Sequence, residues 1–524
     1  MTSSSPWIRR VALTPPSLKD NTADADRLVA ALKKELATER VDIDLDLLAQ
    51  LPAILRRNDF CARCSVFRDR GGWVLTGIDR SDHPRPAAGL AVDLGTSRVV
   101  LLLIDLADGR TLGEEAFDNP QLAFGPDVLA RLHHAESPGG LKELKDLVIG
   151  GLNRAIDRLC RSAGIEPADV CAVSVAGNTS MTHLFLGLEP RWIIREPYIP
   201  VVNRPGVLKA AGLGINVSPF ARVLVFPNIG SYFGGDLIAG ILFSKLHQRN
   251  DPALLVDVGT NAEVVLGHKD WLIGCAGAAG PALEGGVARM GMMAGPGVVD
   301  RVAIDPETRR FDVHAIEEKP PTGICGSGVI DLAAQLFLAG MIDIRGKLVS
   351  AACGDHLKII EGIRHLVVVP ARQSATGQDL TFSQVELDSL VRSKAAMYTI
   401  LETLTMTVGL NLSELGTVYV AGTFGCFINP RSAIAIGMLP DLPLDRYVPL
   451  GNSSLQGAAL ALTSAAAIDE IDCIRDRITY LELNVNPDFM NRFSAAKFIP
   501  HTDVGRFPSV KSQRKEPPHA GHAG

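Results

Sequence analysis

Residues 92–96 read V-D-L-G-T and residues 256–260 read V-D-V-G-T, so the chain contains nearly the same acidic, glycine-containing stretch twice. An apolar run stands on each side of both copies, as in GLAVDLGTSRVVLLLID from residue 89 and ALLVDVGTNAEVVLG from residue 253. The order of apolar run, turn and apolar run predicts a β-hairpin. Because each copy opens a similar series of strands and turns, we expect an internal duplication.

The chemistry of these two turns favours a phosphate ligand. A hairpin turn presents several backbone N–H groups to one point, which suits phosphate, and Gly95 and Gly259 let phosphoryl oxygens approach because they carry no side chain. Asp93 and Asp257 repel phosphate, but either can hold Mg²⁺, directly or through water, and the metal then bridges the phosphates. Two such turns facing each other would hold a nucleotide triphosphate from both sides.

A third glycine turn completes this hypothesis. VYVAGTFG at residues 418–425 reads as a strand breaking into a turn, and its Gly422 and Gly425 suit a sugar or α-phosphate. One D-x-G-T is a common turn, but two copies followed by this segment favour a nucleotide site. The chain has neither a Walker-type G-x-x-x-x-G-K-[ST] nor a G-x-G-x-x-G after a strand, which argues against other nucleotide-binding folds.

These motifs, in this order, resemble the ASKHA superfamily of acetate and sugar kinases, heat-shock ATPases and actin. Within it, several longer motifs are similar to the reductive activators of corrinoid proteins: AVDLGTS, DNPQLAFGPDVLARLHHA, VAGNTSMTHLFLG, NIGSYFGGD, LLVDVGTNAE, AAGPALEGG, GICGSGVIDL, VYVAGTFG and AIGMLP. Those ATPases restore an inactivated Co(II) corrinoid of a methyltransferase to Co(I). The resemblance covers roughly residues 10–505.

The resemblance implies an α/β chain with a duplicated actin/ribonuclease-H-like (ASKHA) ATPase fold and a small N-terminal α+β linker domain. The residues agree for the N-terminal part, where Gly71-Gly72 predicts a hairpin and the proline-rich DHPRPAAG closes the unit. Farther along, Ser383 and Glu386 have the spacing of a capping box for a long helix. The expected divisions are a linker domain (1–86), a middle domain with the first turn (87–250), a C-terminal domain with the second turn and the adenosine motif (251–507), and a disordered tail (508–524).

The resemblance also implies roles for individual residues. Asp93 and Asp257 are expected to hold Mg²⁺, while Asp236 either orients water or caps a helix. Lys394 either contacts adenine or lies on a solvated helix face, and Glu263 is a weaker catalytic candidate. The residues expected to bind the nucleotide are Gly95, Thr96, Ser97, Gly259, Thr260, Asn261, Gly422, Gly425 and, more weakly, Glu284.

The cysteines depart from the family pattern. Such activators usually begin with a ferredoxin domain whose cysteines follow C-x4-C-x2-C, whereas Cys61 and Cys64 form a lone C-x-x-C. In a strand these two thiols would point to opposite faces, so we expect a structural or incidental role, and Cys325 is expected to pack rather than bind metal. No iron–sulfur cluster is expected in this chain, and the electron would come from a separate iron–sulfur or flavin protein.

Composition limits the partners and the location. Net charge is −6 and the pI is about 6.1, which gives no reason to expect nucleic acid or an anionic membrane. Neither a signal peptide nor a membrane helix is evident, so the expected location is the cytoplasm. By resemblance, the expected partners are a corrinoid protein or methyltransferase and a second copy of the chain.

The expected function is therefore ATP- and Mg²⁺-dependent reductive activation of a corrinoid-dependent methyltransferase system. Two alternatives remain open: a small-molecule kinase on the same scaffold, and a non-redox ATPase or scaffold. Relatives of the hydantoinase type normally carry a D-x-G-G-T turn, and both turns here lack the second glycine.

Overall fold

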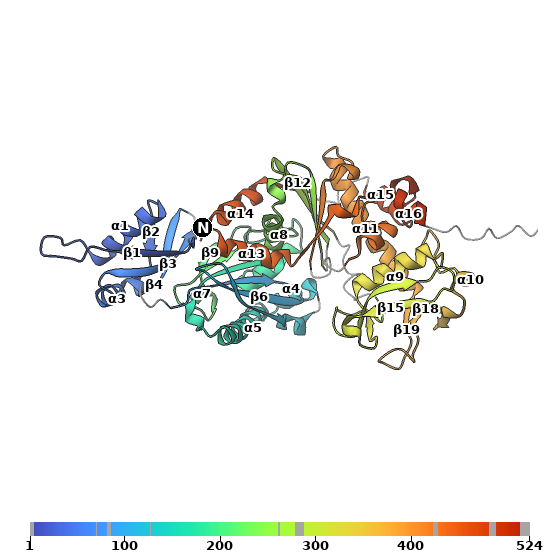
Figure 1. The fold of residues 1–524 in the computed structure, drawn as a ribbon, viewed down its shortest axis with the longest axis horizontal. Helices are drawn as coiled ribbons and strands as arrows, with labels where there is room; N and C mark the ends of the chain where they lie inside the picture. Colours follow the sequence, from blue (N-terminus) through green and yellow to red (C-terminus); the bar gives the residue numbers. More distant parts are fainter. Residues whose placement is uncertain are drawn as a thin grey trace, which may run out of the picture. The chain divides into compact units, whose positions relative to one another are not determined.

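The computed structural model describes residues 5–69, 71–80, 85–125, 127–259, 262–277, 288–422, 428–481 and 489–513. The chain forms two compact units, the first made of residues 1–245 and 453–477 and the second of residues 246–452 and 478–524. The late helices α13 (Ser453–Thr463) and α14 (Ala465–Arg477) pack on α8 (Gly235–Ser244) of the first unit (Figure 1). Each unit is therefore built from two separate segments of the sequence.

A four-stranded sheet in the order β1-β3-β4-β2 begins the first unit. The hairpin expected around Gly71-Gly72 is confirmed, because β3 and β4 are antiparallel with Asp69 opposite Gly72. Leu28 and Leu32 of α1 are buried in the core beside this sheet. The elements are β1 (Ile8–Ala12), α1 (Asp24–Leu36), β2 (Val41–Ile43), α2 (Leu45–Leu48), α3 (Leu51–Arg57), β3 (Cys61–Asp69) and β4 (Gly72–Arg80).

Two six-stranded sheets, one in each unit, share a five-stranded topology, and only their sixth strands differ: β9 pairs antiparallel with β10, whereas β22 pairs parallel with β13. The first has the order β7-β6-β5-β8-β10-β9 and the second the order β21-β20-β11-β12-β13-β22. In the shared part, three antiparallel strands are followed by two strands that add in parallel beside the first of them. This repeat confirms the duplicated fold. The strands are β5 (Ala88–Leu94), β6 (Arg98–Asp105), β7 (Thr111–Asp118), β8 (Val170–Gly177), β9 (Gly206–Lys209), β10 (Arg222–Val225), β11 (Ala253–Val258), β12 (Ala262–His268), β13 (Trp271–Gly277), β20 (Thr417–Ala421), β21 (Tyr447–Gly451) and β22 (Ile478–Tyr480).

Helices cover these sheets with buried apolar faces. The long helix α5 makes the crossover from β7 to β8, as α11 makes the crossover to β20 in the second unit. The packing of α13 on α8 is close, since a Cβ at Gly457 would lie 2.1 Å from the carbonyl oxygen of Ala239. The remaining helices are α4 (Val128–Ala135), α5 (Gly140–Ala163), α6 (Thr179–Leu186), α7 (Ala210–Leu213), α9 (Gly326–Leu338), α10 (Ser350–Cys353), α11 (Gln384–Thr407), α12 (Pro430–Ala435), α15 (Phe489–Ala496) and α16 (Pro508–Gln513).

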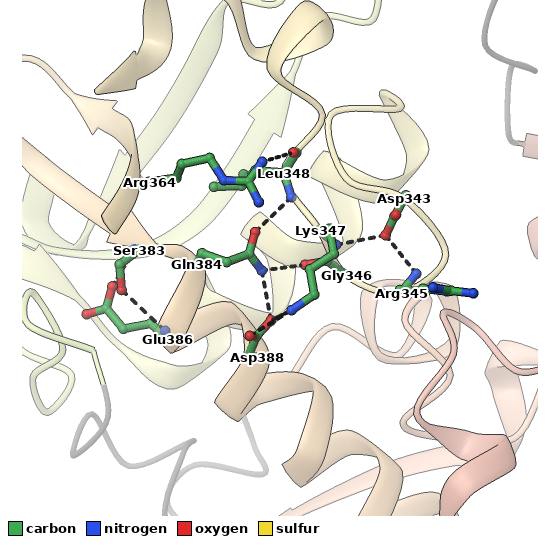
Figure 2. Close-up of polar contacts among 10 residues, drawn as sticks. All are labelled: Asp343, Arg345, Gly346, Lys347, Leu348, Arg364, Ser383, Gln384, Glu386 and Asp388. Carbon is green, nitrogen blue, oxygen red and sulfur yellow. Dashed lines mark hydrogen bonds and ion pairs between the residues drawn. The ribbon is translucent and has the colours of Figure 1, made fainter. Parts of the chain in front are cut away.

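Two small three-stranded sheets lie between β13 and α11 in the sequence of the second unit. Ser383 ends one of them and caps α11: its hydroxyl accepts a hydrogen bond from the Glu386 amide at 3.2 Å, and the Glu386 carboxylate accepts one from the Ser383 amide (Figure 2). The predicted capping box is therefore confirmed. The strands are β14 (Val298–Ile304), β15 (Phe311–Ala315), β16 (Gly323–Ile324), β17 (Leu357–Ile360), β18 (Ile363–Val369) and β19 (Leu380–Ser383).

The tail differs from the expectation at its start. Residues 508–513, expected to be disordered, form α16. The reason is the burial of apolar side chains: Val510 is only 3% exposed and joins the core of the second unit together with Phe507. Ser509 adds hydrogen bonds from its amide and hydroxyl to the Asp441 carboxylate, both at 2.8 Å. Among the described residues, no helix combines the length and the apolar character needed to cross a membrane.

Candidate functional site

Both aspartates of the repeated motif stand one residue before the end of a central strand. Asp93 on β5 lies opposite Val100 of β6 and Ala176 of β8. Asp257 on β11 lies opposite Glu263 of β12 and Ala421 of β20, and is half-buried like Asp93. Each aspartate thus lies just before a hairpin turn and beside the end of the neighbouring parallel strand. Directly opposite residues share a face of a sheet, so the second unit places two carboxylates side by side.

The first turn is too tight for any side chain at its glycine. A Cβ at Gly95 would lie 2.3 Å from the carbonyl oxygen of Arg98, well inside the closest approach of real atoms. Gly95 is therefore required by the closure of this turn, and its backbone also stays open to a ligand.

Buried side chains hold the carbonyl groups of this turn from behind. The Asn119 side-chain amide donates to the Gly95 carbonyl at 3.0 Å, and its backbone amide donates to the Ser97 carbonyl at 2.8 Å. The Arg131 guanidinium donates from Nη1 to the Thr96 carbonyl at 2.7 Å. In a trans peptide the C=O of one residue and the N–H of the next point in opposite directions. The N–H groups of Thr96 and Ser97 therefore point away from these buried side chains, which is the arrangement that binds anions.

The Thr96 hydroxyl is held by a helix cap. Asn178 is the N-cap of α6: its Oδ1 accepts from the Met181 amide at 2.9 Å, and its Nδ2 donates to Thr96 Oγ1 at 3.0 Å. The side chain of Asn178, the residue after β8, therefore caps α6 and also positions the turn.

Three elements bring two carboxylates and a hydroxyl to the same place. Ser454 at the start of α13 donates from Oγ to Asp93 Oδ1 at 2.8 Å. Burial raises the pKa of Asp236 to about 7; the Leu237 amide, which donates to Asp236 Oδ1 at 2.8 Å, lowers it, and the negative charge of Asp93 raises it. A Cβ at Gly234 would lie 2.4 Å from Asp236 Oδ1. Asp93 and Asp236 thus have different environments, which is typical of carboxylates with different roles.

Asp236 does not cap its helix. The N-cap of α8 is Gly234, and Asp236 is the second residue of the helix. The alternative that gave Asp236 a capping role is therefore wrong, because α8 begins two residues earlier than a cap at that position would require.

The second unit joins its aspartate to the predicted nucleoside turn. Gly422 has φ of +88°, and a Cβ there would lie 2.7 Å from Asp257 Oδ1 and 2.7 Å from the Val258 carbonyl oxygen. Its amide donates to the Gly451 carbonyl at 3.1 Å. Glycine is needed at position 422 for both the backbone conformation and the space, so the two motifs of this unit are in direct contact.

The remaining expected site residues are those near the second turn and Lys394. Gly259 is half-buried after β11, whereas Thr260, Asn261, Glu284 and Gly425 lie outside the described residues. The expectation of a solvated helix face for Lys394 is wrong. Lys394 is 1% exposed, and its ammonium donates to the carbonyls of Phe498 and, at 2.8 Å, Pro500. Burial lowers its pKa well below the usual value.

The residues behind the first turn were missed from sequence. Asn119 and Arg131 lie within DNPQLAFGPDVLARLHHA, and Asn178 lies within VAGNTSMTHLFLG. The available signal was the presence of these polar residues within long family motifs. Ser454 carried no such signal, because it belongs to a different stretch of sequence altogether.

The two cysteines of the C-x-x-C motif and Cys325 are not arranged to share a ligand. Cys61 and Cys64 occupy one regular stretch of β3 opposite Ala12 and Arg9 of β1, so their thiols lie on opposite faces. Burial raises the pKa of Cys64 to about 12, and Cys325 is buried at the start of α9 with its thiol 3.4 Å from the Val299 carbonyl oxygen. Among the described residues, no group of three or more His, Cys, Asp or Glu side chains is arranged to hold a metal ion.

Comparison with known proteins assigns the chain to a family. Models of three family regions match it: the RACo linker region at residues 4–84, the RACo middle region at residues 88–249, and the C-terminal domain of RACo, the ASKHA domain, at residues 251–511. Corrinoid activation enzyme RamQ of Eubacterium limosum is 30% identical over 431 residues, covering 81% of this chain and 72% of RamQ. The [Co(II) methylated amine-specific corrinoid protein] reductase of Methanosarcina barkeri is 24% identical over 424 residues, covering 75% of this chain and 73% of the reductase.

A solved structure agrees with these matches. The structure of a reductive activator for corrinoid,iron-sulfur protein aligns with a TM-score of 0.87 and 38% identity, covering 97% of this chain and 81% of that chain. With its repeated D-x-G-T turns at equivalent places in two sheets that share a five-stranded topology, the chain belongs to the RACo family of corrinoid activation enzymes, with linker, middle and ASKHA C-terminal regions in that order.

Proposed function

We propose that this protein is an ATPase that restores the Co(II) corrinoid of a partner protein to Co(I). The observation that carries the nucleotide part is the first turn, whose carbonyls are bound by Asn119 and Arg131 so that its amides point outward. The corrinoid part rests on the family, whose relatives include a corrinoid activation enzyme and a corrinoid protein reductase.

Mg²⁺·ATP is the ligand that suits this chemistry. Asp93 and Asp257 are half-buried carboxylates at the ends of β5 and β11, and carboxylates with bound water are the usual protein ligands of Mg²⁺. When bound, the ion would neutralise charge on the phosphates. The amides of Thr96 and Ser97 would bind phosphate oxygens, and Gly259 would give the same close approach on the second turn. The backbone at Gly422 would approach the nucleoside side.

Asp236 is the proposed group that takes a proton from the attacking water. Its pKa of about 7 is close to the value that favours general base catalysis at neutral pH. Glu263 lies beside Asp257 across β11 and β12 and would orient water on the second turn.

The energy of ATP would be used for an unfavourable electron transfer. For a one-electron couple, about 59 mV corresponds to about 1.4 kcal/mol. Roughly 5 kcal/mol of differential binding would shift the potential of the corrinoid by about 200 mV. The electron would come from a separate iron–sulfur or flavin protein, and ATP hydrolysis would separate the activator from its reduced partner. We propose that the protein acts as a homodimer in the cytoplasm.

The test is ATP-dependent reduction of a Co(II) corrinoid protein in the presence of a chemical reductant, followed by its optical spectrum. We expect Co(I), or methyl-Co(III) when a methyl donor is present, together with ATP hydrolysis stimulated by the corrinoid protein. Asp257→Ala should abolish the stimulated hydrolysis, whereas Asp312→Ala, an exposed aspartate of β15, should not. A phosphorylated small molecule as product would indicate the kinase alternative instead.

A further inference from the structure

The feature that carries the inference is a fully buried arginine behind the first turn. Arg131 lies in α4 and is 0% exposed. Its Nε donates to the Gly125 carbonyl at 3.0 Å and its Nη1 donates to the Thr96 carbonyl at 2.7 Å. The guanidinium therefore clamps two loops together, and one of them is the turn expected to bind phosphate.

This guanidinium has no anionic partner among the described residues. Its Nη2 is buried without a hydrogen-bond partner there, and its other close contact is the Met181 sulfur, 3.7 Å from Nη1. Two further buried arginines of the same unit are different, because Arg27 pairs with Asp20 at 2.6 Å and Arg222 pairs with Asp44 at 2.8 Å.

An unpaired buried charge is costly to a fold, and buried charges are normally paired or bound to an ion. Burial lowers the pKa of Arg131, and the charge of Asp127 opposes this. Among the described residues, the positive charge behind the turn therefore has no carboxylate in a direct ion pair with it. The amides of the turn point to the opposite side, where an anion would sit.

We propose that Arg131 is a positioning residue of the nucleotide site: it holds the first turn with its amides outward and supplies a buried positive charge that the phosphates of the nucleotide compensate. This inference rests on the proposed function, because it needs a nucleotide at the turn. It adds that the turn recognises the charge of the phosphates as well as their oxygen atoms. Affinity should therefore rise with the charge of the ligand, from adenosine through ADP to ATP.

Two substitutions separate the charge of Arg131 from its hydrogen bonds. Arg131→Gln keeps a donor for the Thr96 carbonyl but removes the charge. Arg131→Lys keeps the charge but removes the planar guanidinium that donates to two carbonyls at once. We expect Arg131→Gln to weaken Mg·ATP binding about tenfold or more, a change of about 1.4 kcal/mol, and to leave adenosine binding within about twofold. Arg131→Lys should retain most of the preference for ATP over adenosine.

The measurement is calorimetric titration of the full chain with Mg·ATP, Mg·ADP and adenosine at two salt concentrations. The salt dependence of ATP binding should decrease in Arg131→Gln and persist in Arg131→Lys. Arg158→Gln is the matched control, because Arg158 lies half-exposed on α5 and pairs with Glu115 at 2.8 Å; it has the same change in net charge and should bind like the wild type.

Four results would overturn the inference. Equal losses of ATP and adenosine affinity in Arg131→Gln would mean that Arg131 only supports the fold. The same equal loss in Arg131→Lys would do so even if the Gln variant does not fold. A wild type that binds ADP and ATP as weakly as adenosine would remove both the charge effect and the proposed nucleotide site, whereas normal wild-type ATP binding with unchanged variants would remove only the role of Arg131.

Discussion

Asp236→Asn should make the protein more stable and less active, and the gain in stability should depend on pH. Burial and the charge of Asp93 raise the pKa of Asp236 from 3.8 to about 7. The folded carboxyl therefore keeps a proton that the unfolded carboxyl loses. Between about pH 4 and pH 7 the folded state therefore binds more protons than the unfolded state, and the free energy of unfolding falls as pH rises. Above pH 7 the full penalty is present.

The magnitude follows from the shift. About three pKa units at 1.36 kcal/mol each give an upper limit of about 4 kcal/mol. Because the side chain is only partly buried, we expect about half of this, roughly 2 kcal/mol at pH 8 and less than half of that value at pH 5. An asparagine keeps the oxygen that accepts from the Leu237 amide, so the substitution removes the charge and little else.

The assay is thermal unfolding at both pH values together with stimulated ATP hydrolysis. At pH 8 the unfolding temperature of Asp236→Asn should rise by roughly 5 °C, with a rise less than half as large at pH 5. Hydrolysis should fall because an amide cannot accept a proton. Asp157→Asn, at an exposed position of α5, is the control. An equal rise at both pH values, or none at pH 8, would show that Asp236 is not held protonated.

Three further substitutions test other contacts. Ser454→Ala removes the hydrogen bond to the aspartate of the first turn and should raise the Mg²⁺ concentration that gives half-maximal ATP hydrolysis several-fold; an unchanged Mg²⁺ titration would contradict this. Gly422→Ala puts a Cβ 2.7 Å from the Asp257 carboxylate in a strained backbone conformation, so calorimetry should show loss of nucleotide binding. The control is Gly409→Ala, which is also at positive φ but in open space and should only lower stability. Lys394→Met should flatten the rise in stability from neutral pH to about pH 10, measured by urea unfolding, because burial lowers the Lys394 pKa and the unfolded chain then binds the extra proton; parallel pH profiles would contradict it.

Much of the fold could be predicted because its signals are local. The hairpin at Gly71-Gly72 and the capping box of Ser383 and Glu386 depend on residues within a few positions of each other, and both are confirmed. The start of the tail was predicted wrongly, because its polar composition concealed Val510, a single apolar residue that the second core buries. Lys394 was misjudged for a similar reason, since its partners are backbone carbonyls about a hundred positions away.

The sequence by itself determined the two D-x-G-T turns, their order and the duplication, because a turn is specified by a few adjacent residues and a repeat is visible as text. Only the tertiary structure decided what holds the first turn in place. Arg131 is 35 positions from Thr96, and Ser454 is 361 positions from Asp93. Nothing in local propensity connects residues so far apart. Their contacts arise when helices pack on the sheet. Burial in that packing then shifts the pKa of Arg131 down and the pKa of Asp236 up.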